Sequence, residues 1–193
     1  ELIDELTHDT KINEKKKIEL YEKSFGNPFF IEEWVSLIKE KDISETIDRS
    51  QELTDDYAIP NTLNSLILTR IDSLEKNLKI LLQKATIIGE EFFIKILSLL
   101  EEKLGLKKDI KKPVDDLETE NFIQHFLKQI DQYKFKHILT RDVAYSTILK
   151  SNRKVLHRSV AEVIENNFPD IIEKFYYDLA IHYDHAEEYS KAL

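Results

Sequence analysis

Glycine and proline are scarce in this chain, and their scarcity is the strongest constraint on its fold. Only three glycines and four prolines occur among 193 residues. Because these residues mark most tight turns, a chain with so few of them is expected to run in long helices. Hydrophobic residues make up 41% of the chain and charged residues 34%, which is typical of a globular protein rather than a disordered one. The length fits one large domain or two small ones.

Apolar residues recur at helical spacing along most of the sequence. Asn27 is expected to cap the helix that Pro28 opens, and Gly26 to end the helix before it. Asp72, with Glu75 three residues on, is expected to cap a later helix, and Thr140 another. The polar stretch 42–58 is interpreted as a linker. The spacing predicts helices over residues 15–24, 28–41, 63–71, 74–88, 91–104, 114–121, 140–149 and 151–168.

Two segments depart from the helical pattern. Tyr133, Phe135 and His137 alternate with lysines, as in a strand, and residues 122–127 precede them across a polar turn, so the pair predicts a β-hairpin. Three helices followed by a hairpin is the order of a winged helix. We therefore expect a mainly α fold with a winged-helix domain over 59–150, preceded by a helical segment over 1–58.

The C-terminal stretch 151–193 is expected to hold a linking helix and the first helices of a repeat. Tyr176, Leu179, Ala180 and Tyr183 match the W-x₂-L-G-x₂-Y part of a tetratricopeptide repeat, with Tyr in place of Trp and Ala in place of Gly. Ala192 falls at the small-residue position of the second helix of the repeat. The pattern predicts the start of an α-solenoid of tetratricopeptide type.

Charge is distributed unevenly along the chain. The net charge is −9, made up of −9 in residues 1–102, +6 in 103–158 and −6 in 159–193. The basic middle is either a surface for a partner, a face that pairs with the acidic flanks, or a set of solvated lysines. The chain has no cysteine, which excludes disulfides, cysteine zinc sites and a thiol nucleophile. It has no methionine and no visible leader, so we expect a cytoplasmic piece of a longer protein.

Several motifs together resemble the C-terminal part of STAND-type signalling ATPases, the AAA-like modules found beside class III nucleotide cyclases, protein kinases and transcriptional activators. The stretch 26–33, GNPFFIEE, is similar to a motif of the helical lid in that family. Further similar stretches are IPNTL (59–63) through RID (70–72), ATIIGEEF (85–92), YKFKH (133–137), DVAY (142–145) and RKVLH (153–157). The resemblance covers nearly the whole chain, and it implies a lid, a winged helix and the entry to a repeat array.

The resemblance also implies where nucleotide would bind. In that family the ATP site lies mostly upstream, on a P-loop unit, and no G-x-x-x-x-G-K-[ST] motif occurs here. ATP or ADP with Mg²⁺ is therefore expected in the longer protein and no cofactor in this segment, which we expect to be non-catalytic. Asn27 and Pro28 would lie by the nucleotide, unless they only join two helices. The implied partners are the upstream ATPase domain, the downstream repeats and a protein partner, with a nucleotide cyclase as the favoured output.

The residues also suggest two other kinds of site, a metal site and a catalytic site. His182 and His185, with Asp178 one turn earlier, could form a surface metal site, but packing histidines are the default interpretation and no metal site is predicted. The resemblance makes His137 and His157 structural, with hydrogen bonds across the junction of helix and hairpin. No Gly-x-Ser-x-Gly motif supports nucleophilic catalysis.

The alternative function is that of a DNA-binding winged-helix transcriptional regulator. The helix in the recognition position, residues 114–121, contains Asp115, Asp116, Glu118 and Glu120 and has no Lys or Arg. Phosphates would repel these carboxylates. The nearby lysines that could still contact phosphates are Lys107, Lys108, Lys111, Lys112, Lys134 and Lys136. Binding to DNA is therefore not expected, and no membrane segment is predicted.

Overall fold

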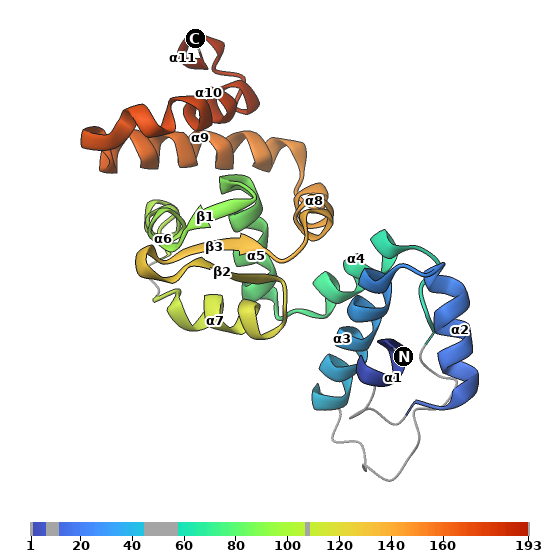
Figure 1. Ribbon diagram of the computed structural model, residues 1–193. Coiled ribbons are helices and arrows are strands. Elements are labelled where there is room, and N and C mark those ends of the chain that lie inside the picture. Colours follow the sequence, from blue (N-terminus) through green and yellow to red (C-terminus); the bar gives the residue numbers. More distant parts are fainter. Residues whose placement is uncertain (1, 7–11, 45–57, 107–108, 193) are drawn as a thin grey trace. The chain divides into compact units, whose positions relative to one another are not determined.

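The chain is mainly helical, as the sequence predicts (Figure 1). The computed structural model describes residues 2–6, 12–44, 58–106 and 109–192. The chain divides into two compact units, residues 1–74 and 75–193, and each is described by itself. Most of the expected linker 42–58 lies outside the described residues. The domain boundaries after residues 58 and 150 stay predictions.

The N-terminal unit is built around one long helix, α3, which contacts the three other helices (Figure 1). Trp34, Ile38 and Leu66 lie in its core, each at most 1% exposed. The first turn of α4 is held by a capping box, in which Thr62 Oγ1 accepts from the Ser65 backbone N–H and the Ser65 hydroxyl accepts from that of Thr62. The helices are α1 (Leu2–Leu6), α2 (Glu14–Ser24), α3 (Pro28–Ser44) and α4 (Leu63–Ser73).

The C-terminal unit combines helices with a three-stranded antiparallel sheet in the order β1-β3-β2 (Figure 1). The helix α7 packs on β2, and α6 and α5 contact β1. The elements up to the hairpin are α5 (Lys76–Ile88), β1 (Glu91–Phe93), α6 (Ile94–Lys103), α7 (Lys111–Thr119), β2 (Ile123–Leu127), a 3₁₀ turn (Lys128–Ile130) and β3 (Gln132–Phe135). The elements after the hairpin are α8 (Ile138–Ser146), α9 (Lys150–Asn167), a 3₁₀ segment (Pro169–Phe175), α10 (Tyr176–His185) and α11 (Tyr189–Ala192).

The predicted hairpin is confirmed, and the structure adds a strand that the sequence did not predict. His125 pairs with Tyr133, and Ile123 with Phe135. The expected helix over 91–104 is wrong in its first three residues, because Glu91–Phe93 forms β1 beside β3. Gly89 ends α5, as expected. A Cβ on this glycine would lie 3.2 Å from the backbone oxygen of Glu91, so the turn into β1 leaves little room for a side chain.

Two predicted helix caps are wrong. The helix α5 begins at Lys76, after Glu75, and no side-chain hydrogen bond caps it, so the Asp72–Glu75 capping box does not form. Thr140 lies inside α8 and is buried, because His137 ends the extended segment and the helix begins directly after it. In both cases the helix starts at a different residue from the one that the local pattern favoured.

The long helix α9 forms the centre of an apolar core in the C-terminal unit. It packs against α5, α6 and α10. Val160 and Ile164 of α9 meet Leu179 and Tyr183 of α10 in one apolar cluster, together with Leu100 of α6. The tetratricopeptide-like residues Leu179 and Tyr183 are therefore buried, whereas Tyr176 is 59% exposed.

Candidate functional site

The turn between α2 and α3 carries the two residues that the resemblance places beside a nucleotide. Gly26 has a φ of 76°, as expected for the residue that separates the two helices. The Asn27 Oδ1 accepts a hydrogen bond from the Phe29 backbone N–H at 3.0 Å, which confirms Asn27 as the cap of α3. Both Asn27 and Pro28 are exposed. Both side chains are therefore accessible to solvent within the N-terminal unit.

The residue before this turn has an unusual backbone. Phe25 adopts the left-handed conformation, with φ at 50°, and its side chain is 93% exposed. Tyr21, one turn earlier on α2, is 65% exposed. Large aromatic side chains rarely adopt positive φ, and such outliers concentrate at functional sites. Phe25, Tyr21 and Pro28 are thus three exposed apolar residues near the end of α2.

A buried ion pair links the helix that follows the turn to α4. Arg70 Nη1 donates to Glu33 Oε2 at 2.7 Å, and the two side chains are 0% and 4% exposed. Removing one partner would leave an uncompensated charge in the core. Glu33 lies less than two helical turns after Pro28, so this ion pair links the first part of α3 to α4.

This ion pair was not predicted from the sequence, although the position of Arg70 carried a signal for it. Arg70 is three or four residues from Leu66 and Ile67 and next to Ile71, so it lies on the apolar face of its helix. A charged residue on that face indicates a buried partner. Lys84 and Glu101 form a second buried ion pair that was not predicted, and their Nζ and Oε1 atoms are 2.5 Å apart.

The basic middle of the chain is partly neutralised within its own unit. Three of its cations pair with carboxylates of the acidic tail: Lys103 with Glu162 at 2.8 Å, Lys154 with Glu187 at 2.5 Å, and Arg158 with Glu188. These pairs favour the interpretation of this stretch as a face that pairs with the acidic tail, although they leave other lysines exposed.

Four of the lysines that could contact phosphates lie on α7 or at the hairpin: Lys111, Lys112, Lys134 and Lys136. Lys111 donates to the Tyr133 hydroxyl at 3.0 Å, which raises the lysine pKa. Lys134 lies 5.0 Å from the centre of the Phe126 ring, and Lys136 donates to Asn121 Oδ1 at 3.2 Å. Lys107 and Lys108 lie outside the described residues. The helix α7 begins at Lys111 rather than at residue 114, so it carries Lys111 and Lys112 as well as the exposed Asp115 and Asp116. Lys111 also pairs with Asp115 at 3.3 Å.

Three histidines meet where α8, α9 and α10 come together. The Nδ1 atoms of His157 and His182 are 2.8 Å apart and hydrogen-bonded, and both residues are 3% exposed. The Tyr145 hydroxyl is 3.1 Å from His157 Nε2 and 3.4 Å from His185 Nδ1. We call these four residues the histidine cluster. His182 is thus buried against His157, rather than exposed at the surface.

Burial lowers the pKa of the two central imidazoles, those of His157 and His182. It lowers the pKa of His157 to about 3, helped by the neighbouring histidines and by Arg141 and Arg153, and it lowers the pKa of His182 to about 4. Both are therefore neutral at pH 7. Among the described residues, no group of three or more His, Cys, Asp or Glu side chains is arranged to hold a metal ion.

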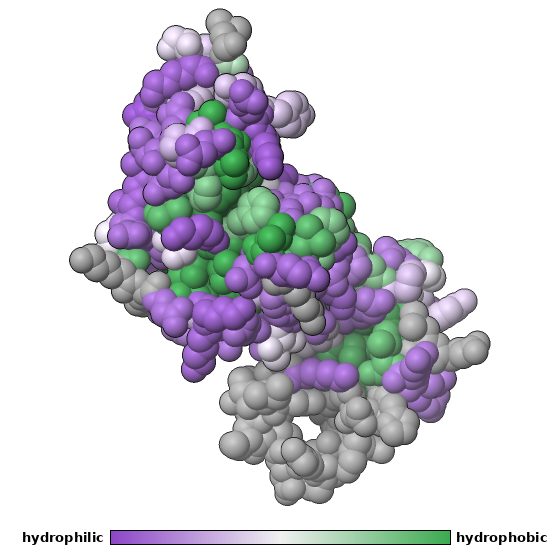
Figure 2. All heavy atoms as spheres, turned by 60° about the vertical axis from the view of Figure 1, so that its left-hand side comes forward, coloured by the Kyte–Doolittle hydropathy of each residue, from purple (hydrophilic) through white to green (hydrophobic). Residues whose placement is uncertain are grey.

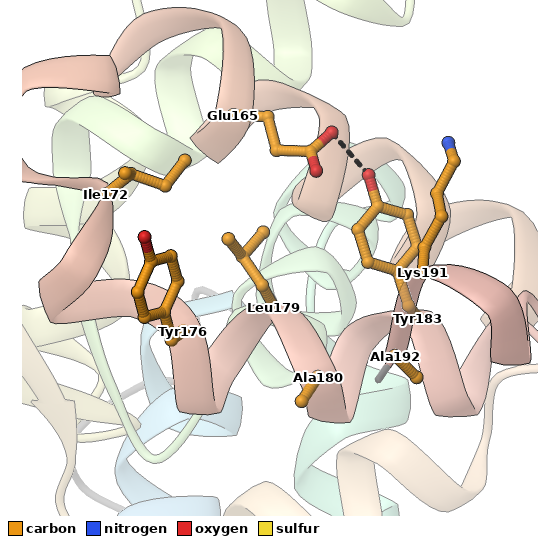
Figure 3. Close-up of a pocket in the computed structure, with 8 residues that line it drawn as sticks. All are labelled: Glu165, Ile172, Tyr176, Leu179, Ala180, Tyr183, Lys191 and Ala192. Atoms are coloured by element: carbon orange, nitrogen blue, oxygen red, sulfur yellow. Dashed lines mark hydrogen bonds between the residues drawn. The ribbon is translucent and has the colours of Figure 1, made fainter.

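A cavity of about 430 Å³ lies beside α10 (Figure 3). The Tyr183 hydroxyl points to Glu165 and donates to its Oε2 at 2.5 Å, and burial is the main cause of the raised pKa of this tyrosine. Figure 2 shows apolar side chains bordered by charged ones over the helices near the C-terminus. The lining residues are Glu165, Ile172, Tyr176, Leu179, Ala180, Tyr183, Lys191 and Ala192.

Comparison with known proteins adds no family. No protein-family model matches the chain, and no curated protein matches it significantly. Across the helices that the structure describes, none has the length and apolar character needed to cross a bilayer. The function must therefore be argued from the residues and their geometry.

Proposed function

We propose that this chain is a regulatory segment of a multidomain signalling ATPase, which couples the nucleotide state of an upstream P-loop domain to a sensor or effector. The segment itself carries out no chemistry. Its turn at Asn27–Pro28 contacts the nucleotide, and its C-terminal helices lead into repeats that bind an inducer or a protein partner. The favoured effector is a nucleotide cyclase, and the compartment is the cytoplasm.

The observation that carries this proposal is the rigid link between the exposed turn and α4. Asn27 and Pro28 are exposed at the start of α3, and Glu33 on the same helix holds Arg70 of α4 in the core. A proline ring is a rigid apolar surface suited to packing on adenine. A ligand that displaces Pro28 would therefore move α3 and α4 together.

The order of elements in the C-terminal unit supports a winged helix within it. Three helices (α5, α6 and α7) precede the hairpin β2–β3, and β1 adds a third strand next to β3. The predicted winged-helix domain, residues 59–150, also takes in α4, which lies in the N-terminal compact unit.

The C-terminal helices support the entry to a repeat array. Leu179 and Tyr183 are buried at the contact of α10 with α9, and Ala180 and Ala192 line the cavity beside α10. Small residues at these two positions allow paired helices of a repeat to approach closely. The exposed Tyr176 stands where the repeat pattern has Trp.

The test is Pro28→Ala in the protein that carries the P-loop. We expect weaker ATP and ADP binding, measured by calorimetry, and a reduced response of the output to nucleotide. Pro169→Ala, at the start of the 3₁₀ segment after α9, is the matched control and should leave both unchanged. Unchanged affinity and output in Pro28→Ala would contradict the proposal.

The alternative, a DNA-binding regulator, rests on the net charge of +6 in residues 103–158. It is tested by fluorescence anisotropy of the chain with labelled duplex DNA at low salt. We expect no binding, because the chain has a net charge of −9 and α7 carries the exposed carboxylates of Asp115 and Asp116. Saturable binding that weakens steeply with salt would favour the alternative.

A further inference from the structure

We propose that the histidine cluster is a proton-operated latch, which holds α10 on α9 at neutral pH and releases it on acidification. The latch goes beyond the nucleotide-coupled role and does not depend on it. It rests on the way in which Tyr145, His157, His182 and His185 are hydrogen-bonded across three helices.

The contact between the two central imidazoles limits how many protons the cluster can hold. In the 2.8 Å hydrogen bond between the Nδ1 atoms of His157 and His182, one ring must donate and the other must accept. An imidazolium carries a proton on both nitrogens and cannot accept. The two histidines therefore cannot both be charged while this bond exists. At 3% exposure, neither ring has solvent to replace it.

Two arginines beside the histidine cluster disfavour an imidazolium at His157. From α8 and α9, Arg141 and Arg153 lie over the Tyr145 ring, at 5.2 and 4.4 Å from its centre. On α10, Asp178 is one turn before His182, and burial raises the pKa of its carboxyl group. The third histidine, His185, lies on the same helix as a further potential cation.

The two glutamates that follow α10 are paired with cations of α9. Glu187 pairs with Lys154, and Glu188 pairs with Arg158. Among the described residues, no hydrogen bond joins a carboxylate to His157 or His182. Protonation of the cluster is therefore opposed by burial and by the arginines together.

The sign of the pH dependence follows from these neighbours. The pKa values of both imidazoles are lower in the closed state than the ordinary value of 6.5. The open state, in which the rings reach water, then binds protons more readily. The latch is at full strength above pH 6.5 and weakens as the pH falls toward 4. Each imidazole favours opening by about tenfold per pH unit over this range.

Opening would have a defined structural effect. Leu179 and Tyr183 of α10 lie in the apolar cluster that α9 shares with α6. Release of α10 would expose these side chains and leave α8 and the hairpin in place. A buried histidine pair whose protonation changes a helix contact is an established type of pH switch.

The experiment uses the absence of native cysteines in the chain. Ser151→Cys on α9 and Asp184→Cys on α10 place spin labels at two exposed positions, and their separation is measured by pulsed electron paramagnetic resonance. We expect one short distance at pH 7.5 and a growing population of longer distances between pH 6.5 and 4.5.

Substitution of single histidines shows which of them takes up the protons that accompany opening. His157→Gln and His182→Gln, each in the labelled chain, should remove about one proton from the slope of opening against pH, and the double variant should lose the dependence. His125→Gln is the matched control, because His125 lies in the hairpin against Glu118 and Tyr133, and it should keep the original profile. An unchanged profile in the double variant would overturn the proposal.

A second measurement decides the question if the double variant does not fold. Nitrogen-15 resonances of the imidazoles in the unsubstituted chain report protonation and tautomer directly. We expect both His157 and His182 to be neutral at pH 6, with one of them protonated on Nδ1. A charged ring at either position at that pH would refute the latch.

Discussion

Phe25 shows how a single residue can retain an unfavourable backbone. A non-glycine residue in the left-handed region costs about 1–2 kcal/mol, and the side chain of Phe25 gains little from packing because it is 93% exposed. Asparagine tolerates this conformation and commonly ends helices. Phe25 therefore lowers the stability of the folded chain relative to asparagine at the same position.

Phe25→Asn should raise the free energy of unfolding of the N-terminal unit by about 0.5–1 kcal/mol, because the strain at positive φ is relieved. Gly26→Ala is the converse, since Gly26 also has positive φ and a Cβ there would meet no atom within 4 Å. It should lower stability by about 1 kcal/mol through the backbone alone. Urea titration of both variants checks the pair, and equal effects of one sign would contradict it.

The Glu33–Arg70 pair makes a sharper prediction. Glu33→Leu or Arg70→Met alone should lower the free energy of unfolding by about 3–5 kcal/mol, because each leaves one buried charge without its partner. The double variant should recover most of the loss, since a pair of apolar side chains needs no compensation. Trp34 is the only tryptophan and lies beside Glu33 in the core, so its fluorescence reports this unfolding. Additive losses in the double variant would exclude coupling.

At the scale of elements, the sequence predicted what depends on neighbours in the chain. The helices were predicted because apolar residues repeat at their period, and Asn27 because a cap bonds two residues on. The strand β1 was missed because Glu91, Phe92 and Phe93 lead straight into a helical pattern, and only pairing with β3, about 40 residues later, makes them extended. The caps at Asp72 and Thr140 failed for a related reason, because packing shifted the helix starts.

The residues of the candidate site could likewise be predicted only where they are neighbours in the sequence. Asn27 and Pro28 were accessible to sequence reasoning because they belong to one turn. The contact of His157 with His182 joins positions 25 residues apart, and no local pattern specifies it. The histidines could be named from sequence, but their hydrogen bonds could not.

Gly89→Ala tests the junction of α5 and β1. The added Cβ would lie 3.2 Å from the Glu91 oxygen, so the backbone of β1 must shift. We expect a loss of about 1 kcal/mol in the C-terminal unit. Circular dichroism during urea unfolding measures this loss, while the Trp34 fluorescence transition serves as the control and should not move.

At the scale of the whole molecule, the described residues of each compact unit include an apolar cluster of their own. Residues 1–74 and 75–193 form separate compact units, and the apolar clusters around Trp34 and around Val160 belong to different ones. Units with cores of their own can unfold separately. We predict that unfolding followed by Trp34 fluorescence and by circular dichroism will not coincide in urea. Coincident midpoints and slopes would indicate one cooperative unit instead.

The buried ion pair also bears on how related sequences can diverge. A lineage that loses either Glu33 or Arg70 alone passes through a form with a stranded charge in its core. Substitution of one of these residues is therefore selected against as long as the other is retained. Among descendants of this protein, the two positions should be exchanged together or not at all, and each joint exchange would mark a branch point in the family tree.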